Sequence, residues 1–141
     1  MTQTDACEFG GWDLVLEIPG APVPKPRQTR ADKWQRRPCV LRYRAFETFV
    51  RLRARSVGYA WQDGDAVLFK IGACASWSKG KRAALLGQPH RQRPDLDNLL
   101  KALLDALLPE DSGVADIGWM AKRWAAVPSV QVWRIKEKIH A

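Results

Sequence analysis

The sequence predicts a single α+β domain in which a mixed β-sheet carries its helices mainly on one face. Strand-like and helix-like patterns follow one another in the order β, α, β, α, β, β. The 141 residues suffice for one hydrophobic core, and 46% of them are apolar. Repeats and low-complexity tracts are absent from the sequence. We therefore expect one domain over residues 11–141, preceded by a flexible tail over residues 1–10.

The first half of the chain is expected to supply two strands and a helix. Residues 12–18 alternate in polarity like a strand, and the proline-rich stretch after them cannot remain in a sheet. Residues 41–58 show mostly helical spacing, with Gly58 as the stop. The apolar positions of that helix are Leu41, Ala45, Phe49, Leu52 and Val57. Residues 65–76 are apolar enough for a central strand.

The second half is expected to supply a helix followed by two strands. Leucines recur at i, i+3, i+4, i+7 and i+8 over residues 96–108, which predicts a helix with one apolar stripe. Residues 109–113 break it. Residues 114–127 and 129–138 then look like a pair of strands that turns at Pro128–Ser129.

The charge balance indicates a polyanionic partner. The chain carries 23 Lys and Arg against 15 Asp and Glu, a net charge of +8. Much of this charge lies in two loop-like segments, residues 24–38 and 78–94, which lack the amphipathic period of a membrane-surface helix. Nucleic acid is therefore favoured over a merely solvated surface. The candidates for phosphate contacts are Lys25, Arg27, Arg30, Lys33, Lys79, Lys81 and Arg82.

Of the seven tryptophans, Trp34 lies within the first basic segment and Trp77 directly precedes the second. Trp34 and Trp77 could stack on unpaired bases of a bound nucleic acid. The remaining tryptophans are expected in the core: Trp12, Trp61, Trp119, Trp124 and Trp133. The three cysteines form no CxxC pair, and we assign them no function. No secretory signal or membrane-spanning apolar run is visible, so a cytoplasmic location is expected.

An acidic pair stands out in this basic chain at the start of the helix over residues 96–108. Asp95 and Asp97 lie there with Asn98 beside them. Mg²⁺ takes hard oxygen ligands, usually one or two carboxylates together with water and substrate phosphates. Two carboxylates from one helix end and a third from a neighbouring strand would make such a site. Asp116 is the first candidate for the third carboxylate, and Asp111 is the second.

The same residues also admit a structural interpretation. Asp95 or Asp97 could cap the helix and complement its macrodipole. Asp97, Lys101 and Asp105 could be ordinary surface ion pairs at i, i+4 spacing. Capping needs only one aspartate, however, and the chain supplies two.

The segment RPDLDNLLKALLDAL, residues 93–107, resembles the RusA-type Holliday junction resolvases of bacteria and their phages. The shared pattern is Asp-x-Asp-Asn at the start of a leucine-rich helix, a lysine four residues on and an aspartate about twenty residues on. Its counterparts here are Asp95, Asp97, Asn98, Lys101 and Asp116. Residues 24–54 and 76–85 also resemble family segments, so the likeness spans about residues 12–136. One departure is Ala115, because the family often has a second acid before the third carboxylate.

The resemblance implies a homodimeric endodeoxyribonuclease that resolves four-way DNA junctions by paired symmetric nicks in recombination and repair. It also implies that Asp95, Asp97 and Asp116 hold Mg²⁺, or Mn²⁺ in its place, while Lys101 assists catalysis. A bacterial cytoplasm would be the location, whether the gene belongs to the host or a prophage. The alternatives are a nuclease for flaps or other branched DNA, a non-catalytic basic DNA-binding module, and a lipid- or protein-binding domain.

Overall fold

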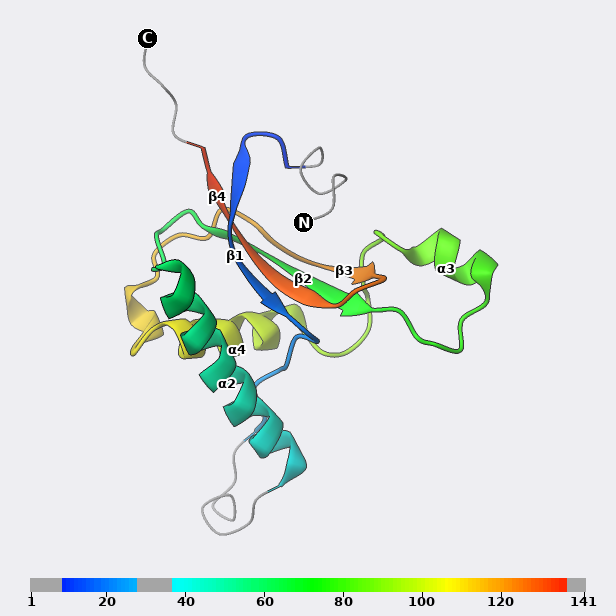
Figure 1. Cartoon of the computed structure of the whole chain (residues 1–141), viewed down its shortest axis with the longest axis horizontal. Coiled ribbons are helices and arrows are strands. Elements are labelled where there is room, and N and C mark those ends of the chain that lie inside the picture. The colour runs from blue at the N-terminus through cyan, green and yellow to red at the C-terminus, as the bar shows by residue number, and fades with distance from the viewer. Residues whose placement is uncertain (1–8, 28–36, 137–141) are drawn as a thin grey trace.

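A mixed four-stranded sheet with the strand order β1-β4-β2-β3 lies at the centre of the molecule (Figure 1). The computed structural model describes residues 9–27 and 37–136, with Asp111 described by its backbone alone. The strands are β1 (Trp12–Pro19), β2 (Ala66–Gly72), β3 (Met120–Ala125) and β4 (Ser129–Ile135). Strand β4 pairs antiparallel with both β1 and β2, whereas β3 pairs parallel with β2.

Two long helices cover one face of this sheet. They are α2 (Pro38–Val57) and α4 (Leu96–Leu107), which lie on the same side of the sheet in Figure 1. A shorter helix, α3 (Lys79–Leu85), projects beyond the ends of β2 and β3, and a 3₁₀ turn (Asp111–Gly113) follows α4. The predicted single α+β domain with helices mainly on one face is thus confirmed. Within the described ranges, no helix is both long and apolar enough to cross a membrane.

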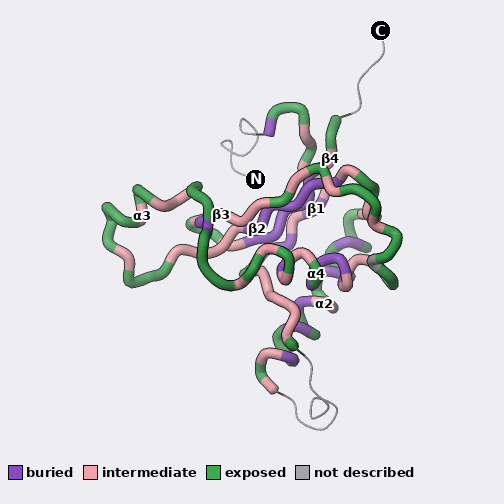
Figure 2. Tube along the Cα trace, turned by 180° about the vertical axis from the view of Figure 1, so that it is seen from behind, coloured by how far each residue is buried: buried purple, intermediate pink, exposed green. Residues whose placement is uncertain are grey.

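The main core lies between the sheet and the two long helices. Val67 of β2 and Val132 of β4 are fully buried there. Val50 of α2 and Leu99 and Leu103 of α4 enter the same core from the helices. Figure 2 shows the buried residues concentrated in the sheet and along α2 and α4, whereas the α3 segment is largely exposed. Each such side chain contributes roughly 1.5–3 kcal/mol when fully buried, so α4 is firmly anchored.

A second cluster covers the opposite face of the sheet. Phe9 stacks against Trp119, with ring centroids 5.0 Å apart, and packs on Trp133 at 4.8 Å. Leu68 and Trp12 join this cluster. Phe9 is therefore fixed to the sheet, although it falls within the segment expected to be a flexible tail; residues 1–8 of that segment lie outside the described residues.

The sequence analysis was wrong about how the last two strands pair. Residues 114–127 and 129–138 were expected to pair with each other, but β2 lies between β3 and β4. The connection over residues 126–128 crosses two strand spacings, about 10 Å, which three extended residues can span. Pro128 passes over Gly72 at the end of β2, where an added Cβ would meet the proline ring at 3.6 Å.

Helix α2 packs by a different face from the one that its apolar spacing suggested. Leu41 and Phe49 are each more than 40% exposed and Leu52 is 59% exposed. The buried positions form a neighbouring stripe: Val40, Tyr43, Phe46, Val50 and Ala54. The helix carries two apolar stripes, and spacing alone does not distinguish the one that meets the core.

Candidate functional site

Asp95 occupies the N-cap position of α4. Its backbone is extended, with φ −69° and ψ 145°, and its carbonyl oxygen accepts the first helical hydrogen bond, from Leu99 N–H. Its side chain makes no capping hydrogen bond. The residue is exposed, and α4 beneath it is anchored in the core through Leu99 and Leu103. Capping therefore does not account for the carboxylate of Asp95.

Asp97 lies in the first turn of the same helix. Its Oδ1 accepts a hydrogen bond from Asn98 N–H at 2.9 Å, and the negative charge complements the positive end of the helix macrodipole. Within residues 9–27 and 37–136, no other hydrogen bond or ion pair reaches the carboxylate of Asp95 or Asp97. Both oxygens of Asp95 and the Oδ2 of Asp97 are thus available to bind a ligand at the start of α4.

The chain leading into α4 is held against β3 by Lys122. The Lys122 ammonium donates hydrogen bonds to the carbonyl oxygens of Gln92 and Pro94, at 2.5 and 2.7 Å. The carbonyl oxygen of Lys122 accepts from His90 N–H at 3.0 Å. These bonds fix residues 90–94 along the strand and so set the position of Asp95.

Lys101 lies one helical turn beyond Asp97 and is exposed. Asp105 does not pair with it, because Asp105 forms an ion pair with Lys25 instead. In the part of the chain that the structure describes, Lys101 makes no ion pair. The side chains of Asp97, Lys101 and Asp105 therefore do not form the surface ion pairs that their spacing allowed. The exposed Lys101 ammonium is available to contact a phosphate.

Asp116 lies elsewhere along the sheet. Its carbonyl oxygen accepts from Gly64 N–H at 3.0 Å, and the neighbouring Ala115 N–H donates to Asp63 Oδ1 at 3.1 Å. These contacts place it where β2 and β3 begin, whereas Lys122 holds the approach to Asp95 against the middle of β3. Among the described residues, no three His, Cys, Asp or Glu side chains are grouped to hold a metal ion.

The donors therefore fit a divalent cation in part. Asp95 and Asp97 supply the hard oxygen ligands that Mg²⁺ prefers, and one or two carboxylates are its usual protein share. The helix macrodipole opposes a cation here with about half a positive charge, which two carboxylates outweigh. Asp116 is not placed with them, and the Asp111 side chain is outside the described structure.

The expected phosphate-binding residues are only partly available. Lys25 is engaged by Asp105, and the Arg82 guanidinium donates to the Cys74 carbonyl oxygen at 3.0 Å. Arg27, Lys79 and Lys81 are exposed. Arg30, Lys33 and Trp34 lie outside the described residues.

Sequence reasoning missed basic groups on α2. Arg42, Arg44 and Arg55 are exposed there, while Arg53 Nε donates to the Glu17 carbonyl oxygen at 3.1 Å. The signal was present, because arginines punctuate residues 41–55 throughout. These arginines alternate with apolar residues, so they form no continuous basic run like those between the elements.

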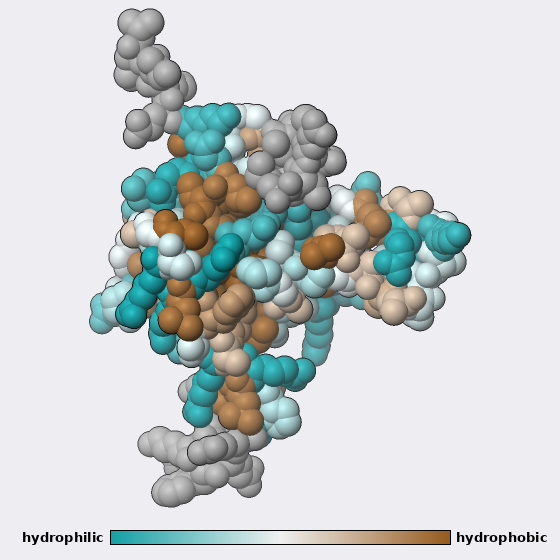
Figure 3. Space-filling view, viewed as in Figure 1, coloured by the Kyte–Doolittle hydropathy of each residue, from teal (hydrophilic) through white to brown (hydrophobic). Residues whose placement is uncertain are grey.

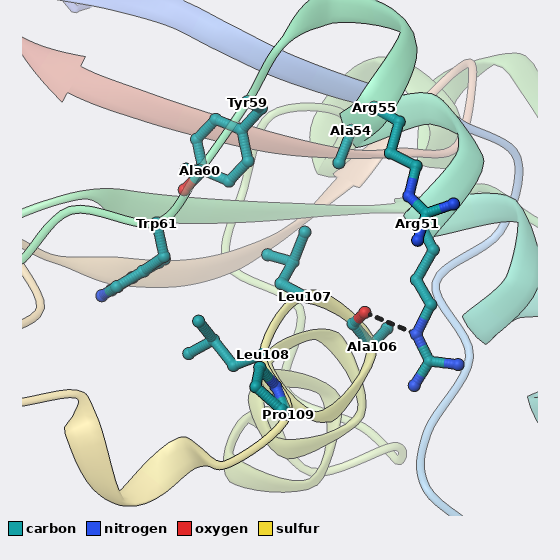
Figure 4. A pocket seen from close by; sticks show the side chains of 10 residues that line it. All are labelled: Arg51, Ala54, Arg55, Tyr59, Ala60, Trp61, Ala106, Leu107, Leu108 and Pro109. Atoms are coloured by element: carbon teal, nitrogen blue, oxygen red, sulfur yellow. Dashed lines mark hydrogen bonds between the residues drawn. The ribbon is translucent and has the colours of Figure 1, made fainter.

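A pocket of about 350 Å³ lies between the C-terminal ends of α2 and α4 (Figure 4). Arg51 reaches across it and donates from Nε to the Ala106 carbonyl oxygen at 3.0 Å, which satisfies the end of α4. Tyr59 and Trp61 form the facing wall. Because α4 has 12 residues, the pocket is about 18 Å from the acidic end of the helix and is separate from it.

The comparison with known families decides the assignment. Residues 19–133 match the family model described as Endodeoxyribonuclease RusA, which is most of the chain. The chain belongs to the RusA endodeoxyribonuclease family. The matched region includes Asp95, Asp97, Lys101 and Asp116, and the expected resemblance is confirmed. No curated protein matches the sequence.

Membership of the RusA family makes the chain a nuclease that acts on DNA. RusA nucleases generally depend on a divalent metal ion, which agrees with the oxygen donors at the start of α4. The excess of basic residues agrees with a polyanionic substrate.

Proposed function

We propose that this RusA-family protein resolves four-way DNA junctions by paired symmetric nicks, in recombination and repair, with Mg²⁺ as cofactor. The observation that carries the proposal is the pair of exposed carboxylates at the start of α4, where the Asp95 side chain makes no capping hydrogen bond. In a chain with a net charge of +8, such a pair would repel DNA phosphates unless a cation lay between them.

In this proposal Asp95 and Asp97 hold the cation and Asp116 completes the ligand set. The cation, when bound, supplies activation of a water molecule and neutralisation of charge on the transferring phosphate. Asp116 would have to approach Asp95 and Asp97 for this, because the described structure does not group the three carboxylates. Lys101, exposed on the same helix, contacts the scissile phosphate.

The test is a nicking assay on a synthetic mobile four-way junction, with a flap and a linear duplex at matched salt. We expect cleavage of the junction in Mg²⁺, none in chelator, and a rate on the junction at least about tenfold above the other two substrates. A preference below a few-fold would instead support a nuclease for branched DNA in general. Junction binding without any cleavage would support a non-catalytic module.

We further propose that the active species is a homodimer. A four-way junction has approximate two-fold symmetry, and two symmetric nicks need two sites related by a C₂ axis. Light scattering should therefore give twice the 15.9 kDa mass of one chain, with or without junction DNA. A single-chain mass under conditions in which both nicks occur together would contradict this proposal.

A further inference from the structure

A second pocket, of about 610 Å³, adjoins the α3 segment and β3. Its lining includes Trp77, Lys81, Gln88, Arg91, Gln92 and Trp124. The α3 segment that carries it forms a lobe beside the sheet, on which apolar and hydrophilic side chains lie next to one another (Figure 3). Gln92 of the lining precedes Asp95 by three residues, so a short stretch of chain links the pocket to the acidic end of α4.

The wall of this pocket is aromatic and fixed. Trp124 is only 7% exposed, and the half-buried Trp77 meets it edge to face, with centroids 4.6 Å apart. The His90 ring packs on Trp124 at 4.2 Å. The first turn of α3 is capped by Ser78, whose Oγ accepts a hydrogen bond from Lys81 N–H at 3.1 Å. The rings therefore form a platform rather than mobile surface groups.

A cation covers this platform. The Lys81 ammonium lies 4.9 Å from the centroid of the Trp77 ring. Such a contact at an exposed position is weak, so the ammonium can leave the ring when a phosphate comes near. Exchange of the ring for a phosphate would free the Trp77 face for another planar group.

The polar lining suits the edge of a base. The amides of Gln88 and Gln92 each offer a donor and an acceptor, and Arg91 is an exposed cation next to them. His90 does not line the pocket but packs on Trp124; it is 4% exposed, and its Nδ1 has no hydrogen-bond partner in the described structure. Burial lowers the pKa of His90, and the charge of Lys122 lowers it further, so the ring is neutral at neutral pH.

We propose that this pocket binds an unstacked nucleobase of the DNA substrate, with Trp77 as the stacking surface and Lys81 on the adjoining phosphate. Its volume is within the range of small-ligand sites, and an aromatic face stacks on any base. The inference rests on the proposed function, because a branch point supplies unstacked bases. A base held here would bring the strand past Gln92 to the carboxylates of Asp95 and Asp97.

Binding is tested by fluorescence anisotropy with a labelled four-way junction in chelator, so that no cleavage is needed. Trp77→Ala should weaken binding about tenfold, and Trp77→Tyr, which keeps an aromatic face, less than threefold. Trp61→Ala is the matched control, because Trp61 is also half-buried but lies at the pocket of Figure 4. That control should bind like the wild type.

The decisive arm is a second junction with abasic sites at the branch point. The wild type should bind it about tenfold more weakly than the intact junction, and Trp77→Ala should lose nothing further. Equal binding of both junctions by the wild type would overturn the proposal, even if Trp77→Ala failed to fold. So would equal weakening by Trp77→Tyr and Trp77→Ala, because a stacking surface would survive the first change.

The two proposals fail in different ways. Dependence of binding on Trp77 without cleavage in Mg²⁺ would remove the proposed activity and leave the base pocket. Normal junction cleavage with no dependence of binding on Trp77 or on the branch-point bases would remove the base pocket alone.

Discussion

Asp97→Asn should reduce DNA cleavage by at least about a thousandfold while junction binding is kept or tightened. The change removes one of the two negative charges at the start of α4 but keeps an oxygen that can accept the Asn98 N–H hydrogen bond. Binding persists because a carboxylate repels phosphates, so its loss does not weaken the attraction of the basic surface. Nicking rates in Mg²⁺ and anisotropy in chelator measure the two effects separately.

Asp13→Asn is the matched control for this experiment. Asp13 lies on β1 with its side chain 62% exposed, and its ion pair with Lys136 is long, at 4.0 Å. The same loss of charge there should leave cleavage unchanged. Nicking at the wild-type rate by Asp97→Asn would mean that the catalytic centre lies elsewhere in the protein.

Asp116→Asn tests the third ligand. A loss of nicking rate as large as that of Asp97→Asn requires Asp116 to act together with Asp97.

Arg134→Met should lower the free energy of unfolding by about 3 kcal/mol. Arg134 donates from Nε and Nη2 to the two oxygens of Asp65, both at 2.8 Å. The Asp65 side chain is only 1% exposed, and it keeps just the Tyr59 hydroxyl, at 2.7 Å, and the Gln62 amide when the guanidinium is removed. A buried carboxylate without its counter-charge is costly, and urea unfolding at neutral pH measures that cost.

Lys136→Met provides the control two residues further along the chain. The Lys136 ion pair is exposed on both sides, so its removal should change stability by less than about 0.5 kcal/mol. A similar small effect for Arg134→Met would show that the ion pair with Asp65 contributes little to stability.

The effect of Arg134→Met should also depend on pH. Burial raises the pKa of Asp65, but hydrogen bonds from Arg134, Tyr59 and the Gln62 amide outweigh it and hold the pKa below its ordinary value of 3.8. The stabilisation is therefore fully present above about pH 4 and is lost as the pH falls through the lower folded-state value. The difference between wild type and variant should be constant near neutrality and shrink in acid.

Local features of the sequence were predictable and long-range ones were not. The leucine spacing predicted α4 within a residue, and the Asp95–Asp97 pair was visible at its start. The placement of β2 between β3 and β4 depends on pairing between distant segments, which no local pattern records. The same holds for Asp65 and Arg134, which are 69 positions apart.

The site was predictable to a similar extent. The spacing from Asp97 to Asp116 suggested a common ligand set, but the backbone of Asp116 pairs with Gly64 before the start of β3, and the described structure does not group the three carboxylates. Helix α3 was not predicted, because its seven residues, KGKRAAL, are too few to show a helical spacing of apolar side chains. The contact of Trp77 with Trp124 forms only when the α3 segment packs beside β3. The sequence alone therefore predicted Trp77 as a stacking residue and Trp124 as a core residue, with no link between them.

The strand order has a consequence for how the protein is made. In the described sheet β1 pairs with β4, and β2 pairs with β3 and β4. Each pairing therefore needs residues beyond 119. While a ribosome is still synthesising the first four-fifths of the chain, β1 and β2 have no strand to pair with. The nascent protein therefore emerges with two apolar strands unprotected, and the sheet assembles only when the C-terminal strands arrive.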